Sequence, residues 1–237
     1  MQPLGPSEIL NLLDRGTGMS AARRGVAILA AATPELTWED VAAVPLGARD
    51  RALLAQRAWI AGPDLSALES CPACKADVEV SFRAEEIGLG GSPTLEPART
   101  TTVELGGRSL RLRPVTTADM IAAESARTPE HAREILLSRV VDGAETLDPE
   151  VIDSIEEALE ELDPAAHVEL RLACPECGEE TVRAFDASSF VWTELADQAR
   201  RLLREVAELA RIYHWSEADI LAMTPTRRHF YLEAGRA

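Results

Sequence analysis

Four cysteines in two pairs are the residues of this chain best suited to chemistry. Cys71 and Cys74 belong to one Cys-Pro-x-Cys segment, Cys174 and Cys177 belong to another, and the 237-residue sequence has no further cysteine. This spacing directs two thiolates at one metal ion, and two such turns supply four sulfurs for a tetrahedral zinc shell. A four-sulfur shell has no position left for a substrate. The pattern therefore predicts one structural zinc ion bound by all four cysteines.

The flanking residues and the separation of the two pairs refine this prediction. Gly178 follows the second pair and suits the left-handed backbone that such turns need, whereas Lys75 follows the first pair. Ninety-nine residues lie between Cys74 and Cys174, so a shared zinc would join distant parts of the chain. Two disulfides, a redox Cys-x-x-Cys motif or unrelated buried thiols are the alternative interpretations.

Composition restricts the class of protein and its partners. With 46% hydrophobic residues the chain can bury a substantial core, and its net charge of −16 argues against binding to nucleic acid. We expect no membrane insertion, because no run of about 18 apolar residues occurs. The N-terminus lacks the pattern of an export signal, so a cytoplasmic location with reduced thiols is expected. The segment 141–190 has fifteen acidic residues and two arginines, which indicates a solvated face or a surface for a basic partner.

The order of predicted elements occurs twice along the chain. The first copy (residues 4–87) and the second (112–190) each have helices followed by a strand, a cysteine turn and a strand. Between them, two alternating runs around Gly106-Gly107 predict a β-hairpin. The expected helices cover 4–13, with Ser7 as its cap, 20–32, 48–60 and 150–162; the expected strands cover 78–82, 102–105, 109–112, 167–172 and 181–185. The predicted fold is α+β: a helical domain over 1–190 with a split zinc-ribbon-like β element made from two degenerate repeats.

The last 47 residues, 191–237, are predicted to form a separate helical tail. Apolar residues from Leu195 to Tyr213 recur every three or four positions over three heptads, and this stripe fits either the protein's own domain or a partner helix. The segment also holds half of the aromatic residues, and aromatic and arginine side chains are frequent anchors at interfaces. The predicted partner contacts are Trp192, Tyr213, Trp215, Arg227, Arg228, Phe230 and Tyr231.

No combination of residues in the sequence predicts an active site. The four histidines are scattered, and Gly88–Gly91 lacks the lysine and helix of a phosphate-binding loop. A dithiol oxidoreductase would need a thioredoxin-like context around one cysteine pair, but strands follow both pairs. We therefore expect a protein that is not an enzyme.

Several motifs together resemble a known family. The two Cys-Pro-x-Cys turns, the helix Arg49–Leu54, the segment Leu110–Pro114 and the C-terminal stretch Ile212–Leu232 are similar to the hub assembly proteins, also called chaperones, of T-even-like contractile-tailed phages and of phage-derived contractile injection systems. The resemblance implies a structural or assembly role at the baseplate hub, no catalysis, and hub or spike proteins as partners. It also implies a cytoplasmic location during assembly, with a place in the finished particle as a second option. The alternative is a zinc-ribbon adaptor that binds a basic protein and is unrelated to phage tails.

Overall fold

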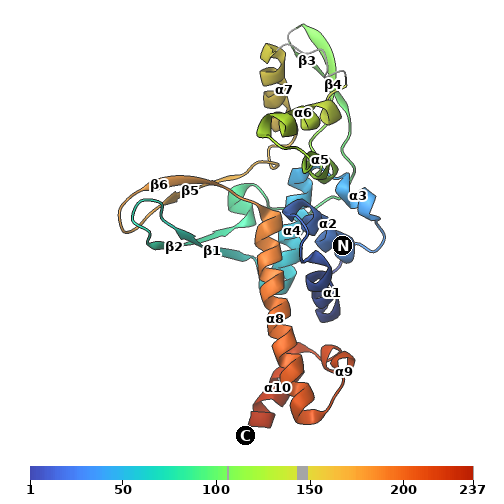
Figure 1. Cartoon of the computed structure of the whole chain (residues 1–237), viewed down its shortest axis with the longest axis vertical. Helices are drawn as coiled ribbons and strands as arrows, with labels where there is room; N and C mark the ends of the chain where they lie inside the picture. Colours follow the sequence, from blue (N-terminus) through green and yellow to red (C-terminus); the bar gives the residue numbers. More distant parts are fainter. Residues whose placement is uncertain (106, 143–148, 237) are drawn as a thin grey trace.

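The computed structural model describes residues 1–105, 107–142 and 149–236 of the chain. These residues fold into helices and small antiparallel sheets, which confirms the predicted α+β class. Figure 1 shows an elongated molecule with a central helical body, an upper lobe, a lower C-terminal lobe and a β-arm that projects to one side. The long helix α8 (Ala187–Tyr213) runs from the body into the C-terminal lobe.

Four N-terminal helices and the first half of α8 make up the body. The bounds of the four are α1 (Pro6–Gly16), α2 (Ala21–Ala32), α3 (Trp38–Ala42) and α4 (Leu46–Ala61). Ser20 caps α2 with its hydroxyl group, and Thr37 and Asp40 form a capping box at α3. Helix α1 begins at Pro6, a residue that suits the first helical position, so the predicted cap Ser7 is wrong and lies inside the helix.

Helix α2 lies at the centre of the body and is apolar on most of its surface. Its residues Val26, Ile28 and Leu29 are completely buried, as are Leu53 of α4 and Val191 of α8. Burying one such side chain contributes roughly 1.5–3 kcal/mol to stability. The body therefore depends on α8 as well as on the N-terminal helices.

The boundary expected at residues 190/191 falls inside α8. The indole of Trp192 is 8% exposed and packs on α1, where a Cβ at Gly16 would lie 2.1 Å from the ring. The Arg24 guanidinium lies over the same ring, 4.7 Å from its centre. The first half of the predicted tail is thus part of the body, because its apolar stripe fills space between the N-terminal helices.

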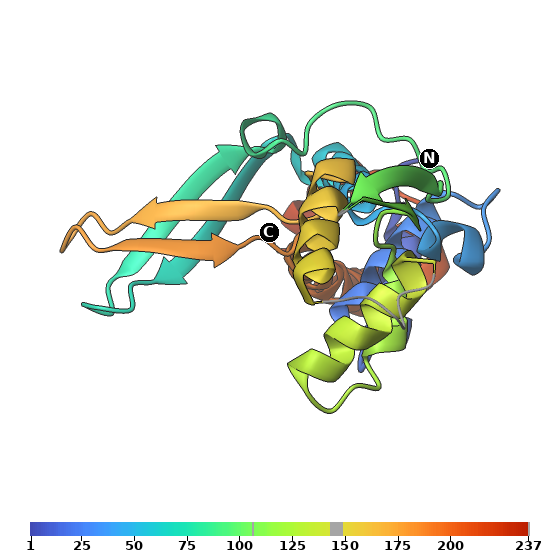
Figure 2. The same ribbon diagram turned by 90° about the horizontal axis from the view of Figure 1, so that it is seen from above.

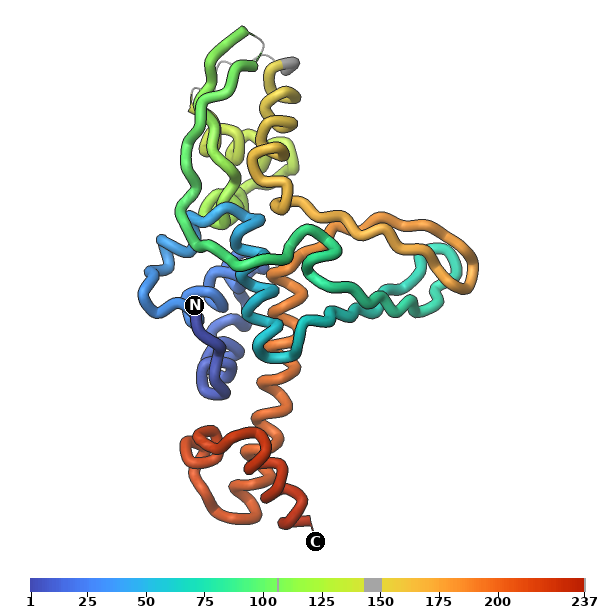
Figure 3. The backbone as a smooth tube through the Cα atoms, turned by 180° about the vertical axis from the view of Figure 1, so that it is seen from behind, coloured from blue at the N-terminus to red at the C-terminus, as the bar shows by residue number. Residues whose placement is uncertain are grey.

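The β-arm consists of two hairpins that leave the body on the same side. Their strands are β1 (Asp64–Ser70) with β2 (Asp77–Arg83), and β5 (Glu169–Ala173) with β6 (Glu180–Ala184). Seen from above, one hairpin lies over the other at an angle (Figure 2). From behind, β1 is seen to follow α4, and β6 leads into α8 (Figure 3). The rings of Phe82 and Phe185 meet edge to face between the hairpins, with 5.6 Å between their centres.

The upper lobe contains the third hairpin and three helices. Its elements are β3 (Thr101–Leu105), β4 (Arg108–Leu112), α5 (Thr117–Ala123), α6 (Pro129–Val140) and α7 (Pro149–Leu162). The strands of the predicted hairpin are confirmed, while Gly106 of its turn and residues 143–148 of the acidic segment lie outside the described residues. A small core around Leu112, Val140 and Ile155 is separate from that of the body.

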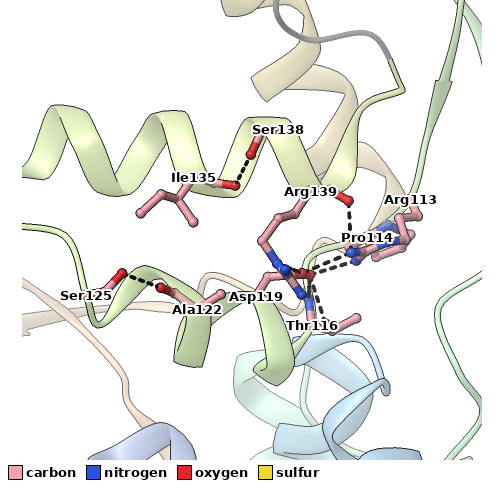
Figure 4. A network of polar contacts seen from close by, with 9 residues as sticks. All are labelled: Arg113, Pro114, Thr116, Asp119, Ala122, Ser125, Ile135, Ser138 and Arg139. Carbon is pink, nitrogen blue, oxygen red and sulfur yellow. Dashed lines mark hydrogen bonds and ion pairs between the residues drawn. The ribbon is translucent and has the colours of Figure 1, made fainter.

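A buried carboxylate connects α5 with α6 and with the segment that follows β4 (Figure 4). Asp119 of α5 accepts two hydrogen bonds from Arg113, at 2.7 and 2.9 Å, and one from Arg139 of α6, at 2.7 Å. It also accepts hydrogen bonds from the backbone N–H and the hydroxyl group of Thr116. Burial opposes the charge, but these donors, with Arg113 foremost, lower the pKa of Asp119 to about 2.

A second carboxylate joins the upper lobe to the body. The backbone N–H of Gly47, in the first turn of α4, donates a 2.8 Å hydrogen bond to Asp163, which follows α7. The contact is close, since a Cβ at Gly47 would lie 2.2 Å from an oxygen of Asp163. Burial raises the pKa of Asp163. The N-cap residue of α4, Pro45, has no side chain that can accept a hydrogen bond from the first turn. Asp163 supplies this acceptor instead and so caps α4 from a distant part of the sequence.

The C-terminal lobe is formed by the second half of α8 with α9 (Glu217–Leu221) and α10 (Pro225–Arg236). His214 has a φ of 57°, and this left-handed residue ends α8. Leu209 of α8 is completely buried, together with Ile220 of α9 and, nearly so, Leu232 of α10. The heptad stripe thus packs on the protein's own helices along its length.

Candidate functional site

Each cysteine pair occupies the turn of one hairpin of the β-arm. The backbone N–H of Cys71 donates to the carbonyl of Ala76, and that of Cys174 donates to the carbonyl of Glu179, both at 2.9 Å. The residue after each pair is left-handed, with φ of 64° at Lys75 and 75° at Gly178. The two turns therefore have the same backbone geometry, although only one has the glycine that this geometry favours.

The two hairpins correspond residue by residue. Each position in the first hairpin matches the position 103 residues later, as Cys71 matches Cys174, and the strand registers agree under this offset. Helices α4 and α7 also begin 103 residues apart. Cys71 and Cys174 are both buried, while Cys74 and Cys177 are both exposed. This correspondence is the arrangement that two copies of one unit would produce.

The four sulfur atoms lie together between the tips of the hairpins. Every pair of Sγ atoms is within 4.8 Å, with 3.7 Å from Cys71 to Cys177 and 3.6 Å from Cys74 to Cys174. These separations exceed the roughly 2.05 Å of a disulfide bond. A tetrahedral zinc ion with Zn–S bonds of about 2.3 Å places its sulfurs about 3.8 Å apart. The sulfur positions fit the predicted metal site.

The close thiols also shift one another's pKa values. Backbone N–H groups of Cys74 and Ala73 lower the pKa of Cys71 to about 6. At Cys177 the backbone N–H of Glu179 favours the thiolate, but the neighbouring thiols, with Cys74 foremost, raise the pKa to about 12. Four thiolates this close repel one another, and a divalent ion among them removes that penalty.

A metal at this position would be structural. The four sulfurs occupy all four positions of a tetrahedron, which leaves none for a reacting molecule. The site would connect a hairpin from each half of the sequence. Because isolated two-stranded hairpins are marginally stable in water, such a link would matter most for the arm itself.

The predicted contact residues of the tail have different environments. Trp192 and Arg228 are buried, and Arg228 donates to Glu205 at 2.8 Å, so neither can anchor a partner. The rings of Tyr213 and Trp215 stack, with 4.5 Å between their centres, and the ring of Tyr231 meets both edge to face. Arg227 and Phe230 are exposed, and the Phe230 side chain is 64% exposed.

The sequence patterns did not predict two buried contacts that hold the fold together. The Asp119 cluster is a buried ionic contact between elements, and the Asp163 cap is a buried hydrogen bond between elements. The only local signal for Asp119 is its place three residues after Thr116, which is the spacing of a capping box. Asp163 gives no such signal, because the helix that it caps begins more than 100 residues earlier.

Comparisons with known proteins identify the family. Among the described helices, none combines the length and apolar character needed to cross a membrane. No curated protein and no solved structure matches the chain. A family model described as T4 bacteriophage base plate protein matches residues 28–192, from α2 through the β-arm to Trp192. This match covers well over half of the sequence, so the chain belongs to the T4 bacteriophage base plate protein family.

Proposed function

We propose that this protein is a non-enzymatic structural or assembly component of the baseplate hub in a contractile injection system. The family match carries the baseplate part of this proposal. The hub part rests on the resemblance of the sequence to hub assembly proteins. On this proposal the protein binds hub or spike proteins, in the cytoplasm during assembly, and its zinc ion has only a structural role.

The chemistry of the main site supports a role without catalysis. A tetrahedral four-sulfur set leaves no coordination position for a substrate. The buried ionic groups of the upper lobe are engaged in contacts that join elements, as Asp119 is with Arg113 and Arg139. These residues explain architecture without any reaction.

We place the specific partner contact on the exposed face of α10. The family match ends at residue 192, so the C-terminal lobe lies outside the matched region. Phe230 is a large apolar side chain that projects into solvent from α10, with Arg227 one turn before it. An exposed aromatic residue beside an arginine is a frequent anchor at protein interfaces.

Co-purification with the hub and spike proteins of the same tail gene cluster tests this proposal. The wild-type chain should co-purify with one of them, and Phe230→Ala with Arg227→Ala should reduce recovery by about tenfold or more. Met120→Ala is the matched control, because Met120 is another exposed apolar residue but lies in the upper lobe. If no hub or spike protein binds the wild-type chain, the hub assignment fails. If the variant and the control reduce recovery of the partner equally, the partner contact is not on α10.

A further inference from the structure

The strands of the β-arm have unpaired edges. Each sheet of the arm contains two strands, so every strand is hydrogen-bonded on one side only. Unpaired edges are templates for a further strand, and natural proteins usually protect them with proline, lysine or a β-bulge. Strand β1 has none of these: it pairs with β2 in continuous register over all seven residues from Asp64 to Ser70.

A groove of about 590 Å³ runs between the hairpins on the side facing α8. Strand β1 lines it with four consecutive residues, 66–69, and β6 lines it with the consecutive residues 183 and 184. Strands β2 and β5 contribute only alternate residues. Since alternate residues of a strand point to opposite faces, consecutive lining residues mean that the groove meets β1 and β6 at their edges.

The register shows which backbone groups of β1 point into the groove. The N–H of Cys71 is directed at the partner strand, where it donates to Ala76. Inward and outward backbone groups alternate in an antiparallel pair, so those of Ser66 and Leu68 point away from β2. The carbonyl of Asp64, which belongs to the same outward set, accepts a 2.6 Å hydrogen bond from Arg57. Ser66 and Leu68 therefore offer donors and acceptors to an added strand.

Side chains and charge along this edge indicate the chemistry of the added strand. Leu68 is 67% exposed on β1 and Val182 is 48% exposed on β6, so the arm presents its large exposed apolar side chains on the two strands that border the groove. Glu69, Asp186, Glu194 and Asp197 line the groove, while Arg183 is the basic residue of the lining. Glu194 is paired with Arg57 and Asp197 with Arg200, so Glu69 and Asp186 are the carboxylates left to attract a basic segment. Residues 64–83 and 169–184 together contain eight carboxylates and four basic side chains. The surroundings favour a positively charged segment with apolar side chains.

We propose that the free edge of β1 binds an extended, basic segment of another protein by strand addition. The segment would exchange backbone hydrogen bonds with Ser66 and Leu68, place apolar side chains beside Leu68, and set its basic residues near the carboxylates of the groove. We assign β1 rather than β6 because β1 is longer and its apolar residue is more exposed. This surface is distinct from the exposed face of α10, so it goes beyond the proposed function.

A random peptide library selected on the zinc-loaded full-length chain tests the inference. Enriched peptides should alternate apolar and other residues, carry net positive charge and protect the amides of Ser66 and Leu68 from hydrogen exchange. Ser66→Pro should weaken their binding about tenfold or more, because proline removes an outward donor and blocks the edge. Ser81→Pro is the matched control: Ser81 is the exposed residue paired with Ser66, but its backbone faces the opposite edge.

Several outcomes would overturn this inference. They are a failure to enrich any peptide, enrichment of acidic or helical peptides, and equal loss of binding in both proline variants when both retain zinc and wild-type thermal stability. Self-association of the chain that Ser66→Pro abolishes would identify a second copy as the occupant instead. None of these outcomes affects the co-purification test of α10, so the two proposals can fail separately.

Discussion

Single residues determine how the two cysteine turns differ. Lys75 and Gly178 occupy the same left-handed position, but a side chain with a Cβ costs about 1–2 kcal/mol there relative to right-handed backbone. Glycine avoids this cost and loses more chain entropy on folding. The Lys75 ammonium donates a 2.9 Å hydrogen bond to the carbonyl of Pro72, which recovers only part of the difference, because Lys75 is exposed.

Exchanging the residues at this position should give effects of opposite sign. We expect Lys75→Gly to raise the free energy of unfolding by about 0.5–1 kcal/mol and Gly178→Lys to lower it by about 1 kcal/mol, as measured by urea denaturation of the zinc-loaded protein. Lys75→Arg, which keeps both the Cβ and the charge, is the control and should change little. A stabilising Gly178→Lys would show that the backbone conformation does not limit these turns.

The Asp119 carboxylate should make the upper lobe sensitive to acid. Its pKa falls from 3.8 in the unfolded chain to about 2 in the folded protein, so the stabilisation is complete above about pH 4 and disappears as the pH falls to about 2. A shift of this size corresponds to about 2–3 kcal/mol. The free energy of unfolding is measured between pH 4.5 and pH 2 in steps of about 0.5 unit. It should fall by this amount in the wild type and by less in Asp119→Asn.

Asp142→Asn is the control for that experiment. Asp142 pairs with Arg111 at 3.4 Å, and both side chains are 66% exposed, so its contribution is small. A wild-type pH dependence that is unchanged in Asp119→Asn would refute the assignment.

At the scale of elements, local rules predicted most of the fold. The helix expected over 20–32 is α2, and the third hairpin follows from alternation around glycine. Strand β1 was harder to localise, because Asp64–Ser70 has no β-branched or aromatic residue and depends on pairing with β2. The cysteine cluster was predicted as a set, since spacing alone specifies metal ligands of this kind.

Contacts between distant elements could not be predicted in the same way. The three-heptad stripe of α8 is compatible with any apolar surface, and Trp192, which precedes the stripe, is buried because Gly16 leaves space for its ring. The expectation that Trp192 and Arg228 face a partner failed for this reason, because sequence composition cannot separate a buried anchor from an exposed one.

Truncations should show that the first half of α8 is needed for the body to fold, whereas α9 and α10 are not. A chain ending at Phe190 loses Val191, Trp192 and Leu195 from the body core, so we expect it to be insoluble or unfolded rather than a stable body. A chain ending at His214 keeps these residues and should still unfold cooperatively with zinc bound, although it lacks α9 and α10. Circular dichroism melts and zinc content distinguish the two. A folded, zinc-loaded chain ending at Phe190 would mean that α8 is dispensable for the body.

At the scale of the whole molecule, the four cysteines bring the two halves of the sequence together at the tip of the β-arm, outside the cores of the body and the upper lobe. The first hairpin follows α4 and the second precedes α8, so the arm is connected to the body at its base and would be closed at its tip by zinc. Between these points few buried apolar residues hold the hairpins together; Phe82 and Phe185 meet edge to face. The metal should therefore govern the arm, while the body keeps its own core of Leu and Val side chains.

Chelation of the purified protein tests this division of stability. We expect one zinc ion per chain by elemental analysis, and its removal should sharply increase hydrogen exchange in residues 64–83 and 169–184 while α2 and α4 stay protected. Cys74→Ser should reproduce the exchange of the metal-free arm without chelator, because it removes one of four ligands, whereas Ser70→Ala next to the site should not. Protein prepared under reducing conditions without chelator that contains no zinc would refute the metal site. If chelation exposes α2 and α4 to the same degree as the arm, the site must instead stabilise the whole fold, and the body cannot be regarded as independent of the metal.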